Sequence, residues 1–178
     1  MPTLTHEHPK VCWASLTCLA FLCDEYTPRL QRDYHEPVMK AILGLLYSEN
    51  THIKIKTRAV SCLINFSREL LNHADHKSLL DNYVNDIMTN LVGLFEVGMA
   101  KEYYPLIEEV LSILSILAEL LGEKFSQYYS TFMPGLKNLL ASLGSENTDS
   151  LNLRQLTIST IGHLLGSFKE NYQPISDD

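Results

Sequence analysis

The fold is decided by two similar stretches, HPKVCWASLTCLAFLC at residues 8–23 and HIKIKTRAVSCLINFS at residues 52–67. A shift of 44 residues, from 8 to 52, aligns them and places Cys18 on Cys62 and Leu19 on Leu63. Apolar residues in both stretches recur at the three- and four-residue spacing of an amphipathic helix. The sequence therefore predicts two helices in equivalent positions of a repeated structure.

The same repetition extends to the rest of the chain. Residues 37–43 (PVMKAIL) align with residues 134–140 (PGLKNLL) at a shift of 97, and apolar residues of 53–66 align with those of 151–164 at a shift of 98. These shifts are two periods of about 48 residues, the size of a HEAT or armadillo-type repeat. Such helix pairs stack into a curved solenoid, whereas a plain helical bundle is the alternative.

Apolar spacing predicts an all-α chain of seven helices and gives no convincing strand pattern. Gly98 is expected to end the fourth helix, Gly122 to end the fifth, and Pro134 to bend or restart the sixth. The helices are expected at about residues 9–23, 29–47 (with a start at 33 as the alternative), 52–71, 77–97, 101–121, 123–143 and 151–168.

The phase of the repetition makes the odd-numbered helices the second, or B, helices of their pairs and the even-numbered ones the first, or A, helices. Residues 1–178 are thus one HEAT-repeat segment of about three and a half antiparallel pairs. It divides into a partial repeat at 9–25 and three repeats at 29–71, 77–121 and 123–170. Since neither end shows the polar face of a capping repeat, we expect part of a longer array.

Composition narrows the classes of partner. The 178 residues include 14 Lys+Arg and 21 Asp+Glu, which gives a net charge of −7. This charge disfavours non-specific binding to nucleic acid or anionic membranes and favours basic partners. Uncharged apolar runs are shorter than a bilayer span, and the N-terminus lacks a signal-peptide layout. The cysteines Cys12, Cys18, Cys23 and Cys62 form no CxxC pair, so we expect buried thiols in the cytosol or nucleus.

Several stretches resemble the importin-beta (karyopherin-beta) family of nuclear transport receptors, and within it the importin-five, or karyopherin beta-three, branch. They are HPKV at 8–11, LINF at 63–66, SLL at 78–80 with Tyr83, EKF at 123–125, YY at 128–129 and FMPGLK at 132–137. The block from 123 to 137 is the most specific. The resemblance covers nearly the whole chain, which looks like the central part of such a receptor.

The resemblance implies a segment that binds basic nuclear-localisation segments of cargo proteins for import through the nuclear pore, and that moves between cytoplasm and nucleus. It also implies nucleoporins as partners, and Ran GTPase through regions outside this chain. Neither nucleic acid nor membrane is expected as a partner. A HEAT-repeat scaffold of another complex, of the phosphatase- or chromosome-associated type, is the alternative function.

Enzymatic chemistry is not expected. The motifs GxGxxG, GxxxxGK[ST], HExxH and GxSxG are absent from the sequence. The histidine pairs His6 with His8 and His73 with His76 lack companion ligands at a useful spacing, so we interpret them as solvated loop residues. We therefore predict no catalytic residue, metal or cofactor.

Acidity is concentrated in the second part of the chain. Residues 1–72 hold 8 Lys+Arg and 7 Asp+Glu, whereas residues 73–178 hold 6 and 14. In the fifth helix, Glu108, Ser112, Ser115 and Glu119 recur on one helical face, with Glu109 beside them. Because B helices line the concave side of a HEAT solenoid, these carboxylates are candidates to bind lysine or arginine of cargo. An ordinary solvated helix face is the alternative.

The third helix presents the opposite charge at similar spacing, through Lys54, Arg58, Ser61, Asn65 and Arg68. This row is expected to face either the neighbouring acidic helix or an acidic part of cargo. The Asn65 amide can bind an extended peptide backbone, or it can fix repeat stacking by a bond to an adjacent B helix or loop. The candidate cargo-binding residues are Asn65, Glu108, Glu109, Ser112 and Glu119.

Aromatic residues suggest a second surface. Tyr103, Tyr104, Tyr128, Tyr129 and Phe132 are expected to cluster near the A helices, where receptors of this family accept phenylalanine-glycine nucleoporins. Core packing is the preferred interpretation for most of them.

Overall fold

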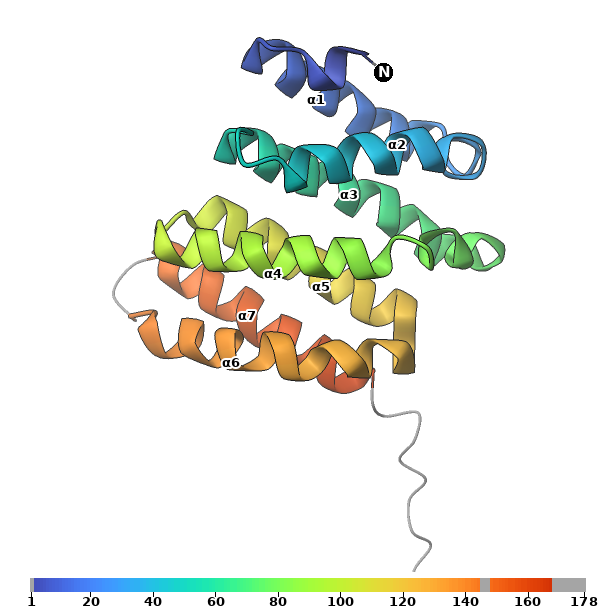
Figure 1. The fold of residues 1–178 in the computed structure, drawn as a ribbon. Coiled ribbons are helices and arrows are strands. Elements are labelled where there is room, and N and C mark those ends of the chain that lie inside the picture. The colour runs from blue at the N-terminus through green and yellow to red at the C-terminus, as the bar shows by residue number, and fades with distance from the viewer. Residues whose placement is uncertain (1, 145–147, 168–178) are drawn as a thin grey trace, which may run out of the picture.

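The computed structural model describes residues 2–144 and 148–167, and within these ranges it contains seven α-helices and no strand (Figure 1). The α-helices are α1 (Pro9–Glu25), α2 (Arg29–Tyr47), α3 (Ile53–Asn72), α4 (Val84–Ala100), α5 (Tyr104–Leu121), α6 (Ser126–Ser142) and α7 (Thr148–Gly166). Short 3-10 helices are η1 (Pro2–Thr5), η2 (Ala74–Leu80) and η3 (Gly122–Phe125). The all-α prediction is confirmed.

The helices form two layers. Figure 1 shows α2, α4 and α6 in front, which we call the A layer, and α1, α3, α5 and α7 behind them, which we call the B layer. The largest packing contacts join α1 to α3, α3 to α5 and α5 to α7, followed by the pairs α2–α3, α4–α5 and α6–α7. The predicted solenoid of three and a half helix pairs is confirmed, while its division into repeats by residue stays a prediction.

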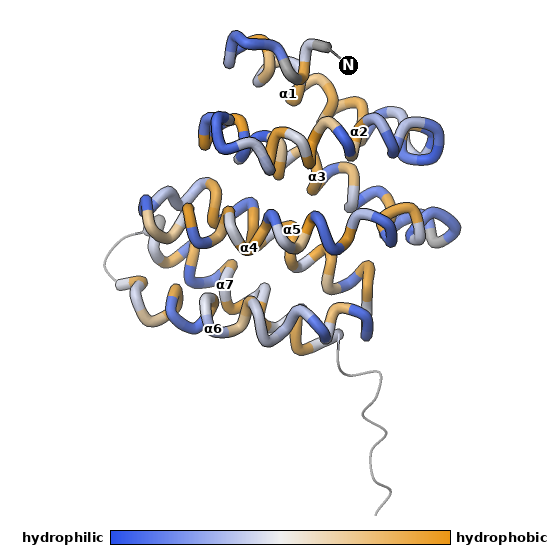
Figure 2. The backbone as a smooth tube through the Cα atoms, in the orientation of Figure 1, coloured by the Kyte–Doolittle hydropathy of each residue, from blue (hydrophilic) through white to orange (hydrophobic). Residues whose placement is uncertain are grey.

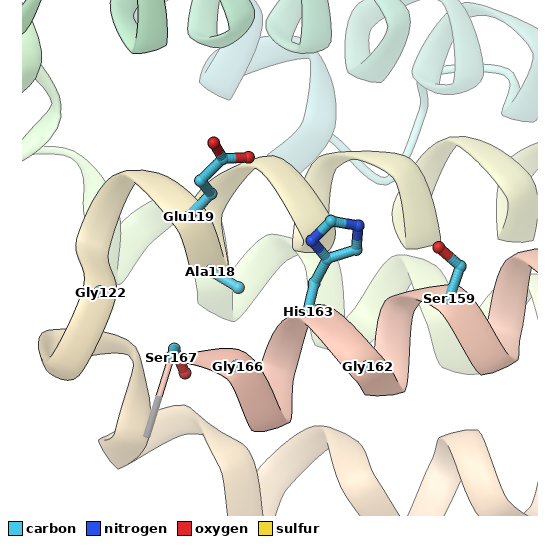
Figure 3. A pocket seen from close by; sticks show the side chains of 8 residues that line it. All are labelled: Ala118, Glu119, Gly122, Ser159, Gly162, His163, Gly166 and Ser167. Carbon is cyan, nitrogen blue, oxygen red and sulfur yellow. The ribbon is translucent and has the colours of Figure 1, made fainter. Parts of the chain in front are cut away.

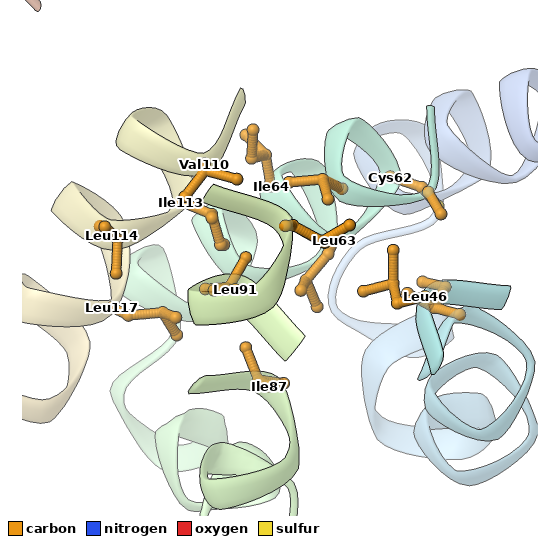
Figure 4. Packing of buried hydrophobic residues seen from close by; sticks show 14 of the residues in the cluster. Leu46, Cys62, Leu63, Ile64, Ile87, Leu91, Val110, Ile113, Leu114 and Leu117 are labelled. Carbon is orange, nitrogen blue, oxygen red and sulfur yellow. The ribbon is translucent and has the colours of Figure 1, made fainter. Parts of the chain in front are cut away.

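One apolar core runs between the layers. Hydrophobic and hydrophilic stretches alternate along each helix (Figure 2), as expected for helices that bury one face. At the centre, Leu63 of α3, Leu91 of α4 and Leu114 of α5 are fully buried close to one another (Figure 4). Burying a side chain of this size stabilises the fold by about 1.5–3 kcal/mol. The layers therefore hold together through apolar contacts that continue from repeat to repeat.

The two histidines that open the repeated stretches have the same structural role. The Nδ1 atom of His8 accepts a hydrogen bond from the backbone N–H of Lys10 at 3.3 Å, and Nδ1 of His52 accepts one from Lys54 at 3.2 Å. Each bond satisfies a backbone donor that a helix start leaves unpaired. Pro9 occupies the first turn of α1, as its missing N–H predicts.

The fourth and sixth helices differ from the prediction. The predicted start of the fourth helix is η2 followed by a turn, and α4 continues to Ala100, so Gly98 does not end it. A Cβ at Gly98 would lie 2.8 Å from Ile107 Cγ1, so this glycine instead permits close packing on α5. Gly122 ends α5 at φ +52°, as predicted, and α6 passes through Pro134 without a second start.

Cys12, Cys23 and Cys62 are buried as predicted, but the prediction for Cys18 is wrong, because its side chain is exposed. Although Cys18 aligns with Cys62, α3 has a B-layer neighbour on each side, whereas among the described residues α1 packs on one B helix, α3. Cys18 lies on the other side of α1, in a shallow hollow with Val11 and Ala14.

The predicted aromatic cluster is also wrong. Tyr103 and Tyr104 lie at the start of α5, whereas Tyr128, Tyr129 and Phe132 lie on α6, which begins after α5 has ended. The 18 residues of α5 span about 27 Å, and the start of α6 lies near the opposite end of α5 from Tyr103 and Tyr104. The preferred interpretation, core packing, is confirmed for most of them, since Phe132 is buried and Tyr103, Tyr128 and Tyr129 are partly buried against the core. Tyr128 packs edge-on against Phe125 at 6.0 Å between ring centroids.

Gly135 of α6 provides a test of the A-layer packing. A Cβ there would lie 2.8 Å from Phe95 Cε1 of α4, so Gly135→Ala should lower the free energy of unfolding by about 1–3 kcal/mol. Gly93→Ala in α4 is the matched control, because its Cβ meets nothing within 4 Å and should raise stability by about 0.4–1 kcal/mol. Urea unfolding followed by circular dichroism measures both. Equal stability of the two variants would contradict the predicted contact between α4 and α6.

Candidate functional site

All five candidate residues lie in the B layer, with Asn65 on α3 and the other four on α5. Glu119 is exposed, and Glu108, Glu109, Ser112 and Asn65 are half-buried. The structure therefore places them on one layer, but their hydrogen bonds divide them into two groups with different roles.

Glu109 links two B helices. The Ser61 hydroxyl of α3 donates a hydrogen bond of 2.7 Å to Glu109 Oε1 of α5. Burial raises the pKa of the Glu109 carboxyl, while the bond from Ser61 and the positive charge of Arg58 act in the opposite direction. The predicted contact between the basic row of α3 and the acidic helix is thus present at this position, and this oxygen of Glu109 is already engaged within the protein.

Arg58 links α3 to the helix on its other side. Its Nε atom donates a hydrogen bond of 3.1 Å to Thr17 Oγ1 of α1, and its guanidinium lies 5.6 Å from the centroid of the Trp13 ring. A guanidinium at that distance over an indole is attracted by the ring electrons. Neither Trp13 nor Thr17 is predicted from the sequence as a partner of Arg58. They could have been found because they align at 44 residues with Thr57 and Ser61, beside Arg58.

Of the two partners predicted for the Asn65 amide, a peptide backbone or an adjacent B helix, the structure shows the adjacent B helix. Its Nδ2 atom donates to Asp24 Oδ2 at 3.0 Å and approaches the backbone oxygen of Ala20 at 3.4 Å, both on α1. The Asn65 amide therefore ties α3 to α1, and a contact of Asn65 with a peptide stays a prediction.

The serines of the α5 stripe bond within the protein. Ser112 donates to the backbone oxygen of Glu108 at 2.8 Å, and Ser115 lies 3.2 Å from Thr160 Oγ1 of α7. Among the described residues, no side chain bonds or ion-pairs with the carboxylates of Glu108 and Glu119. These two carboxylates are consequently the groups of the stripe that remain available to a ligand.

A groove lies between the second halves of α5 and α7, with a volume of about 510 Å³. In Figure 3 the His163 side chain points from α7 toward α5, whereas the Glu119 side chain points from α5 away from α7. The lining residues are Ala118, Glu119 and Gly122 from α5 and its end, and Ser159, Gly162, His163, Gly166 and Ser167 from α7 and its end. His163 and the glycines are not among the candidate residues predicted from the sequence.

Neither a metal centre nor a membrane segment is indicated in the part of the chain that the structure describes. There, no three His, Cys, Asp or Glu side chains are placed to hold a metal ion. No helix in the same part combines the length and the apolar character that crossing a membrane requires.

Comparison with known proteins places these features in a family. No protein-family model matches the sequence. Importin subunit beta-3 of Saccharomyces cerevisiae is 30% identical over 148 residues, which are 83% of this chain and 13% of the relative. A probable importin-5 homolog of Dictyostelium discoideum is 30% identical over 86 residues, which are 48% of this chain and 8% of that relative.

Solved structures agree. The crystal structure of the karyopherin Kap121p matches with a TM-score of 0.76 and 27% identity, over 95% of this chain and 15% of Kap121p. Fold and relatives together define the class as a HEAT-repeat α-solenoid. The chain belongs to the importin-beta (karyopherin-beta) family, and its relatives are the importin beta-3 and importin-5 proteins. It spans about one eighth of the length of the yeast relative.

The Glu109 link predicts a pH effect on stability. Because the folded pKa is raised, the native state binds more protons than the unfolded state between the two pKa values, so stability falls as pH rises through that window. Glu109→Gln keeps an acceptor for Ser61 and removes the charge, so the stability lost by the wild type through that window should be absent in the variant. Each unit of pKa shift corresponds to about 1.4 kcal/mol.

Urea unfolding of both proteins between about pH 4 and about pH 8 measures this effect. Glu119→Gln is the control, since its exposed carboxylate bonds to no described side chain. A difference between wild type and Glu109→Gln that is constant over the whole range would contradict the assignment.

Proposed function

We propose that this chain is a protein-binding segment of a nuclear transport receptor, and that its B layer binds basic nuclear-localisation segments of cargo. The observation that carries the proposal is 30% identity to importin subunit beta-3 over 83% of the chain. Kap121p, which has the same fold, has been crystallised bound to Pho4p, Ste12p, Ulp1p and the C-terminus of Cdc14p.

The free carboxylates of α5 support a basic ligand. Glu108 and Glu119 are 11 residues apart on one face of α5, which separates them by about 16 Å along the helix. A cationic side chain beside either carboxylate gains a charge-assisted hydrogen bond. Since no described side chain neutralises the pair, an extended segment with two separated lysines fits the spacing.

The same proposal includes the wider activity of the receptor. A Kap121p structure bound to the nucleoporin Nup53p supports nucleoporins as partners, and a shuttling receptor works in cytoplasm and nucleus. Ran GTPase is proposed to act through regions outside this chain. The function is binding without chemistry, so no catalytic residue is assigned.

Charge reversal tests the proposal. Fluorescence anisotropy of a labelled lysine-rich localisation peptide should show binding that weakens as salt rises, because screening shortens the reach of the carboxylates. Glu108→Lys combined with Glu119→Lys should weaken binding by about tenfold or more. Glu36→Lys combined with Glu96→Lys changes the charge equally on exposed A-layer positions and should change affinity far less. Absence of binding to the folded wild type, or equal losses in both double variants, would refute the B-layer site.

A further inference from the structure

An apolar row is exposed on α7. It consists of Leu151, Ile158 and Leu165, which recur every seven residues and therefore lie on one side of the helix. Their exposed fractions are 48%, 55% and 47%. Thr160 of the same helix lies 3.2 Å from Ser115 of α5, and residue 158 points about 200° round the helix from residue 160. This α7 outer row therefore faces away from α5.

A second row is exposed on α1, at the other end of the B layer (Figure 1). It consists of Ala14, Cys18 and Phe21, at spacings of four and three residues, and Phe21 is 64% exposed. Other positions of α1 make the polar contacts with α3, since Thr17 and Asp24 accept its hydrogen bonds. This α1 outer row therefore lies outside the contact with α3.

The internal repeat shows what the α1 outer row is equivalent to. At the shift of 44 residues, it aligns with Arg58, Cys62 and Asn65 of α3. In α3 these residues face the preceding B helix, because Arg58 and Asn65 bond to α1 and Cys62 between them is fully buried. The α1 outer row is thus the side on which a B helix packs against the B helix before it.

The α7 outer row is equivalent to the opposite side of α3. At the shift of 98 residues, it aligns with Ile53, Val60 and Ser67. Val60 and Ser67 are fully buried, and Val60 points about 200° round the helix from Cys62, away from α1. On that side α3 has its second B neighbour, α5. The α7 outer row is thus the side on which a B helix packs against the B helix after it.

We propose that the α1 outer row of one copy of this chain stacks on the α7 outer row of a second copy, head to tail, and so continues the B layer from one copy into the next. The occupant is a second copy because its two rows are the two sides of a contact that the protein already makes three times, at α1–α3, α3–α5 and α5–α7. Stacked repeats need a polar outer face to stay soluble, and neither row is polar. The proposal goes beyond the proposed function and does not depend on it.

The nature of the two rows determines how the copies associate. Because the rows differ, each pair of copies keeps one free α1 row and one free α7 row, to which further copies can add. One helix face on each side makes a small interface, so the association is weak and depends on concentration. Since the contact is apolar, salt does not weaken it.

Sedimentation of the 178-residue chain from about 5 μM to about 500 μM tests the association. The average mass of the wild type should rise with concentration beyond that of a dimer, at about 0.1 M and at about 1 M salt. Phe21→Glu or Ile158→Glu should weaken self-association about tenfold or more, because each buries a charge in an apolar contact. Tyr47→Glu is the matched control, since Tyr47 is 80% exposed on α2 and its replacement should change association by less than about twofold.

A mixture of the two variants tests the head-to-tail arrangement. Phe21→Glu keeps its α7 row and Ile158→Glu keeps its α1 row, so an equimolar mixture should form a dimer that does not grow further. Because both side chains are exposed, circular dichroism should show each variant folded.

Three results would overturn the proposal. The first is a wild type that stays monomeric at the highest concentration, and the second is association that is lost at high salt. The third is an Ile158→Glu variant that associates like the wild type, because that result would assign the contact to a surface other than the α7 outer row.

Discussion

The stacking of α1, α3, α5 and α7 on one another is the constraint on which the rest of the structure depends. Each B helix buries an apolar face against its neighbours, and α3 and α5 do so on two sides. A helix held on both sides has few positions left for solvent, and those positions carry the polar residues. In α3 and α5 we therefore expect a binding function on the polar row of the helix.

Polar links reinforce this stack at each junction. Asn65 and Arg58 connect α3 to α1, Ser61 and Glu109 connect α3 to α5, and Ser115 connects α5 to Thr160 of α7. They lie at the edge of the apolar contact, where a half-buried hydrogen bond fixes the rotation of one helix against the next. The same row thus serves two purposes, because residues that hold the register stand beside Glu108 and Glu119, which have no described partner.

Much of the fold could be predicted from the sequence, because the same helical pattern occurs in it more than once and so reveals the period of the repeat. The aligned His8 and His52 marked two helix starts correctly, and Gly122 marked one end. Gly98 misled because a glycine that ends a helix and one that permits close packing on Ile107 look alike in the sequence. Cys18 misled because alignment with Cys62 gives the helical position but not whether a neighbouring helix covers it.

The candidate site could be predicted as a polar stripe on α5. Which of its carboxylates is bonded within the protein, as Glu109 is, and which is not, as Glu119, depends on side-chain partners in other repeats. His163 could not be predicted as a groove residue, because the groove is formed by the glycines around it together with α5, which is distant in the sequence.

The two layers are joined unequally along the solenoid. Contacts between successive B helices are the largest in the structure, whereas α2 with α4 and α4 with α6 touch much less. The links between α4 and α6 include a hydrogen bond between Tyr128 and Asn85 and the close approach of Gly135 to Phe95. We therefore expect the B layer to be stiffer than the A layer. On bending of the solenoid we expect the spacing between A helices to change more than the spacing between B helices, since the more extensive close-packed contacts between B helices resist stretching. A ligand bound across two B helices would then keep a nearly constant distance between its contacts while the curvature of the solenoid changes around it.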